Sequence, residues 1–330
     1  MKIKNLVLAV FLSVSTLSAQ SQDSSYIAPL ATKSLLVDIV AENDRLIAVG
    51  ERGHLLISND AGDSWEQKSI PTVSMLTAVV SLGDNIWAVG HDSVIVSSDD
   101  GGDTWSRQQY LPEIQRPLLD VLFFDQSHGV AIGAYGAFFR TQDGGESWAR
   151  EYHVSLLDPY DQEYLEELKE EDEAFYQQEL AAIMPHLNRI TQEGEQLFLA
   201  GESGLLAYSD DKGLSWQRLE PGYMGSFFDI TLLDNGGILA AGLRGNLYES
   251  DASFENWQNV KTGTTATFNS IVKLNNQKYL MVGNNGTLLW YGEDEKRLQK
   301  LKHGKSVLNA VAANGNITAV TAVGIKSLSQ

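Results

Sequence analysis

The stretch Gly133–Trp148, GAYGAFFRTQDGGESW, contains the pattern that decides the fold. Two glycines three residues apart open the stretch, an apolar run follows, and a polar turn ends in tryptophan. Short apolar runs separated by glycine are typical of β-hairpins. The stretch therefore predicts two strands joined by a tight turn, with a second, polar turn after them.

This pattern repeats at intervals of about forty residues, which is typical of propellers and other repeat folds. The polar turn occurs in five places, Ser58–Trp65, Ser98–Trp105, Thr141–Trp148, Ser209–Trp216 and Ser250–Trp257. The frame continues in a sixth copy at Gly283–Gly286, with Leu298 in place of the tryptophan, and in a seventh around Thr321 and Gly324. With a strand before and after each hairpin, the copies predict an all-β, seven-bladed β-propeller of four-stranded antiparallel blades. Six or eight blades are the alternatives, and the number of copies favours seven.

The two ends of the chain predict how such a ring closes. The seventh copy has only three strands, Val307–Ala312, Ile317–Thr321 and Ile325–Leu328, and Tyr26–Lys33 precedes the first copy without a blade of its own. We expect Tyr26–Lys33 to form the outer strand of the seventh blade, because pairing the chain ends removes an open sheet edge.

The polar turn resembles the Asp-box, also called the bacterial neuraminidase repeat, with the pattern Ser/Thr-x-Asp-x-Gly-x-Ser/Thr-Trp. An Asp carboxylate accepts hydrogen bonds from its own turn, Gly permits a positive φ, and the indole packs on the strands. A calcium-binding role for the Asp residues is the alternative, but one carboxylate per turn lacks the converging ligands that calcium needs. We therefore expect a structural role for Asp60, Gly62, Trp65, Asp100, Gly102, Trp105, Asp143, Gly145, Trp148, Asp211, Gly213, Trp216 and Trp257.

Beyond residue 19, the whole chain resembles the seven-bladed Asp-box propellers of the photosystem II stability and assembly factor family. The Gly-x-x-Gly hairpins followed by Asp-boxes carry this resemblance, most fully at Gly133–Trp148. The resemblance implies a non-catalytic extracytoplasmic scaffold that helps a membrane protein complex to assemble or work, without a cofactor. Relatives in non-photosynthetic bacteria resemble companions of RND-type exporters, which implies an exporter as the partner.

The N-terminus has the pattern of a secretory signal peptide. Lys2 and Lys4 precede the apolar run Leu6–Leu12, and small residues lead to Ala19. The run is too short to span a bilayer, so we expect residues 1–19 to be removed and residues 20–330 to fold as one domain in the periplasm.

Composition excludes several kinds of site. The chain of 330 residues contains no cysteine, which rules out disulfides, thiol catalysis and thiolate metal sites. Its 24 basic and 43 acidic residues give a net charge of −19, which disfavours binding to nucleic acids. The six histidines have no paired ligand spacing, so no metal site is expected.

Strand order divides the loops between two faces. The turns between the second and third strands and the links between blades fall on one face, here called the upper face, and the Asp-boxes fall on the opposite, lower face. On the inner strands the repeat aligns a ring of residues at the channel mouth: Asp38, Thr77, Asp120, Arg189, Asp229, Ser270 and Asn309. This ring predicts either strand capping at a solvated rim or a small polar pocket where a partner docks.

One link between blades is abnormally long, and long insertions in compact folds are commonly functional. Residues 158–188 form this insert between the third and fourth blades, and Asp158–Glu179 has ten acidic residues and one lysine. Apolar residues at helical spacing, Tyr164 and Phe175 among them, predict one or two acidic amphipathic helices lying across the upper face. The helices either pack on the rim with a solvated outer side or dock on a basic partner surface.

The upper face provides the candidate binding residues. They are Arg52, Arg116, Arg189, Arg244, Asp38, Asp120, Asp229, Tyr135, Tyr164 and Phe175. A sialidase-like or glucan-acting glycoside hydrolase is the alternative, with the arginines binding a carboxylate and Tyr135 as nucleophile beside Glu202. The Arg-Ile-Pro segment of sialidases is missing and their blade number is six, so a non-catalytic anion site built from these arginines is favoured.

Overall fold

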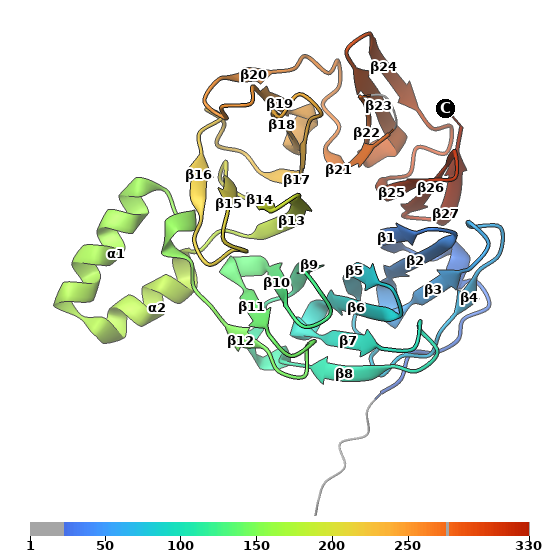
Figure 1. Ribbon diagram of the computed structural model, residues 1–330, viewed down its shortest axis with the longest axis horizontal. Coiled ribbons are helices and arrows are strands. Elements are labelled where there is room, and N and C mark those ends of the chain that lie inside the picture. Colours follow the sequence, from blue (N-terminus) through green and yellow to red (C-terminus); the bar gives the residue numbers. More distant parts are fainter. Residues whose placement is uncertain (1–22, 275–276, 330) are drawn as a thin grey trace, which may run out of the picture.

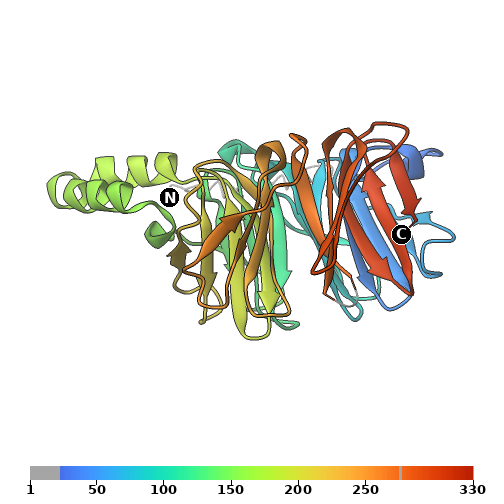
Figure 2. The same ribbon diagram turned by 90° about the horizontal axis from the view of Figure 1, so that it is seen from above.

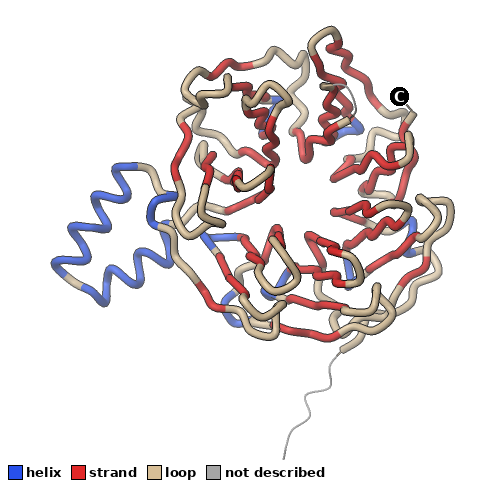
Figure 3. Tube along the Cα trace, in the orientation of Figure 1, coloured by secondary structure: helices blue, strands red, loops and turns tan. Residues whose placement is uncertain are grey.

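A computed structural model describes residues 23–274 and 277–329, and the predicted signal peptide lies outside these residues. Seven small antiparallel sheets surround a central axis (Figure 1). Strands and the loops that join them make up most of the ring, and the two α-helices lie outside it (Figure 3). The predicted all-β propeller with seven blades is thus confirmed. Among the described residues, no helix is long and apolar enough to cross a membrane.

The strands follow one another outward from the axis in each blade. Blades one to three comprise β1 Leu36–Glu42, β2 Arg45–Gly50, β3 Leu55–Ser58 and β4 Glu66–Gln67; β5 Leu76–Leu82, β6 Asn85–Gly90, β7 Ile95–Ser98 and β8 Ser106–Gln109; β9 Leu118–Phe123, β10 Gly129–Gly133, β11 Phe138–Thr141 and β12 Ala149–Arg150. Blades four and five comprise β13 Leu187–Glu193, β14 Gln196–Gly201, β15 Leu206–Ser209 and β16 Gln217–Leu219; β17 Phe227–Leu232, β18 Ile238–Gly242, β19 Leu247–Ser250 and β20 Trp257–Asn259. Blades six and seven comprise β21 Phe268–Lys273, β22 Lys278–Gly283, β23 Thr287–Gly292 and β24 Glu295–Lys300; β25 Val307–Ala313, β26 Asn316–Thr321 and β27 Gly324–Leu328.

The predicted strand at Tyr26–Lys33 is wrong. The seventh sheet has three strands, β25–β26–β27, and Ala31–Lys33 forms a short 3-10 helix beside the start of β27. The segment before this helix lies along the first blade, where the Ser25 amide donates to the Ile70 carbonyl at 2.8 Å. The Gln67 side chain accepts from the Ala28 amide and donates to the Tyr26 carbonyl. These bonds satisfy the segment's backbone on blade one, so it adds no strand to blade seven.

The ring closes by the same packing that joins the other blades. A Cβ on Gly102, in the second Asp-box, would lie 2.3 Å from Ile57 Cδ1 of blade one, so this box rests directly on the preceding blade. The first Asp-box rests in the same way on the last blade, with Thr318 Oγ1 3.4 Å from the Cβ position of Gly62. Leu36 and Leu56 of blade one share a buried apolar cluster with Val320 of blade seven.

Each inner strand enters the ring through a β-bulge, which aims the next side chain at the axis. In blade two the register passes from Leu76 to Ala78, so Ala78, not Thr77, is equivalent to Asp38 of blade one. The alignment of Thr77 with the ring is therefore wrong by one residue, because the turn between the first two strands differs in length between blades, with two residues in blade two and five in blade three. The other six predicted ring residues occupy equivalent positions.

Each Asp-box carboxylate binds its own turn. Asp60 accepts hydrogen bonds from the Ser58 and Ser64 hydroxyls and from the Ser64 amide. The bonds from Ser64 are the main reason that the pKa of Asp60 falls to about 2. Asp100, Asp143 and Asp211 make the same bonds. Each carboxylate therefore has its hydrogen-bond partners within its own turn.

In the divergent fifth box, a different carboxylate holds the turn. Asp251 accepts from the Ser253 hydroxyl and the Asn256 amide group. Phe254 adopts a positive φ of 62°, where other boxes have glycine, and its carbonyl accepts from Trp257 Nε1 at 2.9 Å. The tryptophan contact is therefore kept although the motif Asp and Gly are lost.

The insert is a helical hairpin that projects outward from the ring, here called the arm (Figures 1 and 2). It comprises α1 Pro159–Glu171 and α2 Glu173–Ile183, each capped by an aspartate, Asp158 and Asp172, that accepts two amide bonds. The prediction that the helices lie across the upper face is wrong. Residues 187 and 188, counted in the insert, belong to β13.

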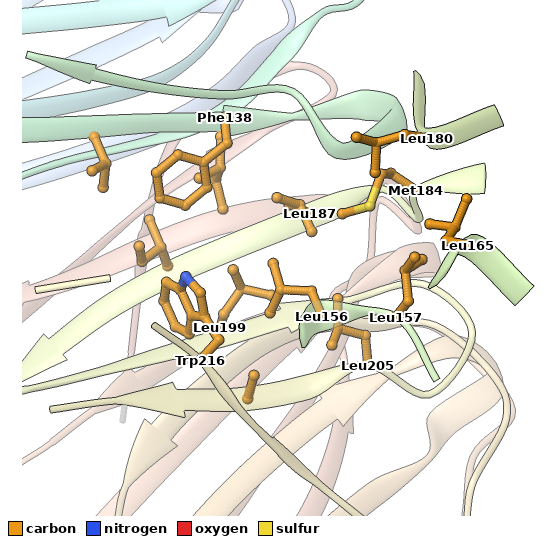
Figure 4. Packing of buried hydrophobic residues seen from close by; sticks show 14 of the residues in the cluster. Phe138, Leu156, Leu157, Leu165, Leu180, Met184, Leu187, Leu199, Leu205 and Trp216 are labelled. Carbon is orange, nitrogen blue, oxygen red and sulfur yellow. The ribbon is translucent and has the colours of Figure 1, made fainter. Parts of the chain in front are cut away.

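The base of the arm is part of the hydrophobic core between blades three and four. Leu165 of α1 and Leu180 of α2 are buried with Met184, beside Leu157 and Leu187 (Figure 4). Gly136 abuts Met184, because a Cβ there would lie 2.3 Å from the Met184 Cβ. This packing fixes the direction in which the arm leaves the ring.

Candidate functional site

Hydrogen bonds confirm the division of the loops between two faces. The Glu51 amide, in the turn between β2 and β3, donates to Leu35 at the start of β1. On the opposite side, the Ala61 amide of the first Asp-box donates to Asp44 between β1 and β2. The upper face carries the short turns Glu51–Gly53, His91–Ser93, Ala134–Gly136, Leu243–Gly245 and Asn284–Gly286, and the arm leaves the ring between blades three and four.

The polar residues at the channel mouth join each blade to the next. Asp38 accepts from the Val79 amide of blade two at 2.8 Å, and Asp229 accepts from the Ile271 amide of blade six at 2.7 Å. Thr77 replaces a ring side chain in blade two by donating to the Leu118 carbonyl of blade three. The remaining joints are Asp120 to the Ile190 amide, Ser270 to Asn309, and Asn309 to Asp38.

Arg189 lies between two aspartates of neighbouring blades. Its guanidinium is 3.4 Å from Asp120 Oδ1 and 3.5 Å from Asp229 Oδ1. Burial raises the pKa of Asp120 to about 6, although the nearby Arg189 acts in the opposite direction. Burial likewise raises the pKa of Asp229, against the effect of Arg189. Both carboxylates also accept hydrogen bonds from backbone amides, so Arg189 and the two aspartates are fixed in place at the channel.

The channel beside this ring of residues contains a cavity of about 400 Å³. Arg189, Asp229, Ser270 and Asn309 are among its lining residues. The polar atoms of these residues already bind one another or the neighbouring strands. The main role of these residues is therefore to join neighbouring blades. Within the described residues, no group of three or more His, Asp or Glu side chains is placed to hold a metal ion.

Arg116 connects the arm to the ring. Its guanidinium donates to the Tyr135 carbonyl at 2.6 Å and to the Ala181 carbonyl in the last turn of α2. A cation at a helix C-terminus stabilises the unpaired carbonyls there. The Tyr135 ring packs edge-on against His186 at 4.5 Å, just beyond the arm. Arg116 and Tyr135 therefore position the arm.

The structure does not bring the predicted arginines together. Arg116 is bound at the base of the arm, and Arg189 is held between aspartates at the channel. Arg52 and Arg244 are exposed in the short turns of blades one and five, and Arg244 lines a separate cavity between blades five and six. No shared anion site forms from these arginines within the described residues.

Exposed apolar side chains gather on the upper loops and the arm. On the arm, Tyr160 is 79% exposed, Phe175 43% and Tyr164 36%. Upper loops expose Val73, Tyr110, Tyr135, Tyr152, Met224 and Leu243. On the Asp-box turns of the lower face, only Leu214 is an exposed large apolar residue within the described chain. Such a one-sided distribution is typical of an interaction surface. Tyr160, Val73 and Met224 were missed, because exposure depends on the path of the loops.

Comparison with known proteins agrees with this architecture. The family model described as Photosynthesis system II assembly factor YCF48 matches residues 18–114 and 108–300. The chain belongs to this family. The match spans all the Asp-boxes and both helices of the arm, so the arm lies within the YCF48 family region.

Solved structures share the fold at low sequence identity. One described as YCF48 bound to D1 peptide aligns with a TM-score of 0.69 and 15% identity, covering 93% of this chain and 97% of its own. YCF48 from Cyanidioschyzon merolae gives 0.68 and 17%, covering 90% and 95%. The WD40 propeller domain of Doa1 gives 0.64 and 13%, covering 94% and 97%. A search of curated proteins by sequence found no match.

Proposed function

We propose that this protein is a non-catalytic periplasmic scaffold that binds an inner-membrane protein complex through its upper face and arm. An RND-type exporter is the partner that the family resemblance favours. The arm is the observation that carries the proposal: it places exposed aromatic residues among acidic ones, outside the ring. Membership of the YCF48 family supports a scaffold role, and one relative is described as bound to a peptide of D1.

The energetics of the arm favour a binding role. Ordering a residue costs about 1–2 kcal/mol of backbone entropy, so an ordered projection needs stabilising contacts. Leu165, Leu180 and Met184 provide such contacts at the base of the arm, and buried Leu168 and Tyr176 provide them nearer its tip. The outer acidic surface, including Glu166, Glu167 and Glu170, is exposed and contributes little to the ring. This surface is suited to a basic partner, because complementary charge speeds association and selects partners.

No observation favours the hydrolase alternative. The predicted arginines lie in separate places, and Arg116 and Arg189 have intramolecular partners. Tyr135 and Glu202 both contact His186 at the base of the arm, and they do not lie beside an arginine cluster.

The test is capture of membrane proteins by variants that keep the core intact. Deleting residues 158–188 is unsuitable, because it would remove buried Leu165, Met184 and Leu187 from the core. We would neutralise exposed acids on α1 by Glu166→Gln, Glu167→Gln, Glu170→Gln and Glu171→Gln. The matched control neutralises as many exposed acids on the lower face, by Asp63→Asn, Asp99→Asn, Glu146→Gln and Glu293→Gln.

Recovery of an integral membrane protein complex from solubilised membranes should fall with the arm variant and stay at the native level with the control. Equal recovery with both variants would overturn the role of the arm. The periplasmic location is tested separately, by finding the mature chain, beginning near residue 20, in the fraction released by osmotic shock.

A further inference from the structure

The joint between blades five and six lacks an Asp-box. In blade one, residues 59–65 connect β3 to β4 and form the box, which rests on the preceding blade. In blade six only two residues, Glu293 and Asp294, connect β23 to β24. This turn is too short to contain a box, so the lower end of the joint between blades five and six has no box to cover it.

Where a box is present, its tryptophan packs between two blades. Trp105 packs on the apolar cluster shared by blades one and two, and Trp257 packs on the cluster shared by blades four and five. The cluster between blades five and six contains Tyr279 and Tyr291, and no tryptophan among its described residues. Because protein interiors are close-packed, the loss of so large a side chain leaves space unless other groups fill it.

A cavity of about 800 Å³ lies at this place on the lower face. Blade five contributes the turn between β17 and β18 together with Glu249 of β19, and blade six contributes Tyr279 of β22 and the hairpin between β23 and β24. Volumes of about 300–1,000 Å³ are typical of sites for small molecules. The missing box therefore coincides with a cavity of the size that a small ligand needs.

Three carboxylates share this cavity without a cationic partner. Glu249, Glu293 and Asp294 line it, and none of them forms an ion pair within the described residues. Lys296, a cation in the cavity wall, donates from its ammonium group to the Lys261 carbonyl. Unpaired acids are frequent in a chain of net charge −19, and these three are distinguished by their convergence on one concave site. Their combined field favours a positively charged ligand.

Two tyrosines form an aromatic part of the wall and contact the polar groups around it. The Tyr291 hydroxyl donates to the Glu249 carboxylate, which holds this carboxylate at the cavity. Tyr279 is 3% exposed, and its hydroxyl accepts from the Asp234 amide at 3.2 Å. The proton of the Tyr279 hydroxyl has no acceptor among the described residues. Since buried donors are normally paired, this one points to a ligand that offers an acceptor.

We propose that this cavity binds a small organic cation that also carries hydroxyl groups, an amino sugar in chemical class. Its ammonium groups would donate charge-assisted hydrogen bonds to Glu249 and Asp294. A hydroxyl oxygen of the sugar would accept from Tyr279, and the Tyr291 ring would contact the cation or the apolar face of the sugar. The site lies on the lower face and does not include the arm, so it adds ligand binding to the scaffold function.

The arrangement of the groups favours an amino sugar over simpler ligands. In the parts of the chain that the structure describes, the acids are not grouped so as to hold a metal ion. A neutral sugar would leave the charge of the three carboxylates uncompensated, and a simple amine would leave the Tyr279 donor unpaired. An amino sugar supplies ammonium donors for the carboxylates and hydroxyl acceptors for Tyr279.

The test is isothermal titration calorimetry with a glucosamine trimer in weakly acidic buffer, where its amines are protonated. The matched neutral probe is the same trimer with each amine acetylated, and spermidine serves as an amine without hydroxyl groups. The site variant is Glu249→Gln with Asp294→Asn. The control variant, Glu146→Gln with Asp99→Asn, makes the same change in charge at exposed positions of two Asp-boxes.

The native protein should bind the glucosamine trimer at one site, and the acetylated trimer about tenfold more weakly. The site variant should lose about tenfold in affinity for the glucosamine trimer, while the control variant and the arm variant should bind it like the native protein. Tyr279→Phe should weaken binding of this trimer about fivefold and leave binding of spermidine unchanged. Unchanged spermidine binding would distinguish the loss of one hydrogen bond from a general loss of structure.

Three results would overturn the proposal. The first is no binding of the glucosamine trimer, or an equal loss with the control variant, which would indicate attraction to the acidic protein as a whole. The second is equal affinity for the acetylated trimer, which would identify a site for neutral sugars. The third is preferential binding of a Lys-Ser repeat peptide that the site variant abolishes, which would identify a basic protein segment as the occupant.

Discussion

The Asn309 side chain, in the last blade, donates a 2.5 Å hydrogen bond to Asp38, in the first blade. Both residues are buried, and Asp38 also accepts from the Val79 amide of the second blade. Asn309 in turn accepts from the Ser270 hydroxyl of the sixth blade. The two residues therefore fasten the first and last blades within the ring of polar joints at the channel mouth.

Replacing Asn309 should weaken this closure. Asn309→Ala leaves one Asp38 oxygen buried without its donor, which costs about 1–3 kcal/mol. We expect the free energy of unfolding in urea to fall by that amount. Asn316→Ala, at an exposed position of β26, should change it by less than about 0.5 kcal/mol. Equal effects of the two substitutions would show that Asn309 is not a joint.

Asp120 should give the native protein a distinctive pH dependence. Its pKa is about 6 in the folded protein and about 3.9 in an unfolded chain, so the folded state binds this proton more tightly. The contribution of this carboxyl to stability therefore falls as pH rises from about 4 to about 6, and is constant above that range.

The measurement is the difference in unfolding free energy between the native protein and Asp120→Asn. It should decline by on the order of 2 kcal/mol across this pH window, since one pKa unit corresponds to about 1.4 kcal/mol. A difference that is constant or rises between pH 4 and pH 6 would contradict the assigned environment of Asp120.

Gly102 should be far less replaceable than Gly83. Both have positive φ angles, 98° and 64°, so alanine strains the backbone at each. At Gly83 nothing lies within 4 Å of the new methyl group, whereas at Gly102 it would meet Ile57 Cδ1 of the preceding blade. Gly102→Ala should lower the melting temperature more than Gly83→Ala, and Ile57→Val should recover part of the difference. No recovery would mean that the box does not rest on blade one.

Arg116 should control the order of the second arm helix. Arg116→Met removes the bonds to the Ala181 and Tyr135 carbonyls, so amides of α2 should exchange with solvent faster. Hydrogen exchange read by mass spectrometry measures this directly. Arg52→Met removes an exposed arginine of blade one and should leave α2 unchanged. Unchanged exchange of α2 in the Arg116 variant would show that packing alone holds the helix.

Most of the fold was predictable from the repeat. Each Asp-box indicates a turn at a known place, because the hydrogen bonds that stabilise the turn come from residues of the box itself. The path of Tyr26–Lys33 was not predictable, since it depends on bonds between Gln67 and backbone groups about forty residues away. The ring residue of blade two was misplaced by one position because the turns after the inner strands differ in length between blades.

The candidate site was predictable only in part. Sequence located the upper face and the acidic insert, but not the outward direction of the arm, which follows from packing of Met184 against Gly136. The roles of Arg116 and Arg189 depend on partners from other blades.

Photo-crosslinking in native membranes tests the central claim most directly. A benzophenone amino acid would replace Tyr164 or Phe175 on the arm and, as the control, Leu214 on the lower face, where 66% of the side chain is exposed. We predict crosslinks to an integral membrane protein from Tyr164 and Phe175 and none from Leu214. Crosslinks of equal yield from Leu214, or none from the arm, would contradict a scaffold that binds its membrane partner through the upper face and the arm.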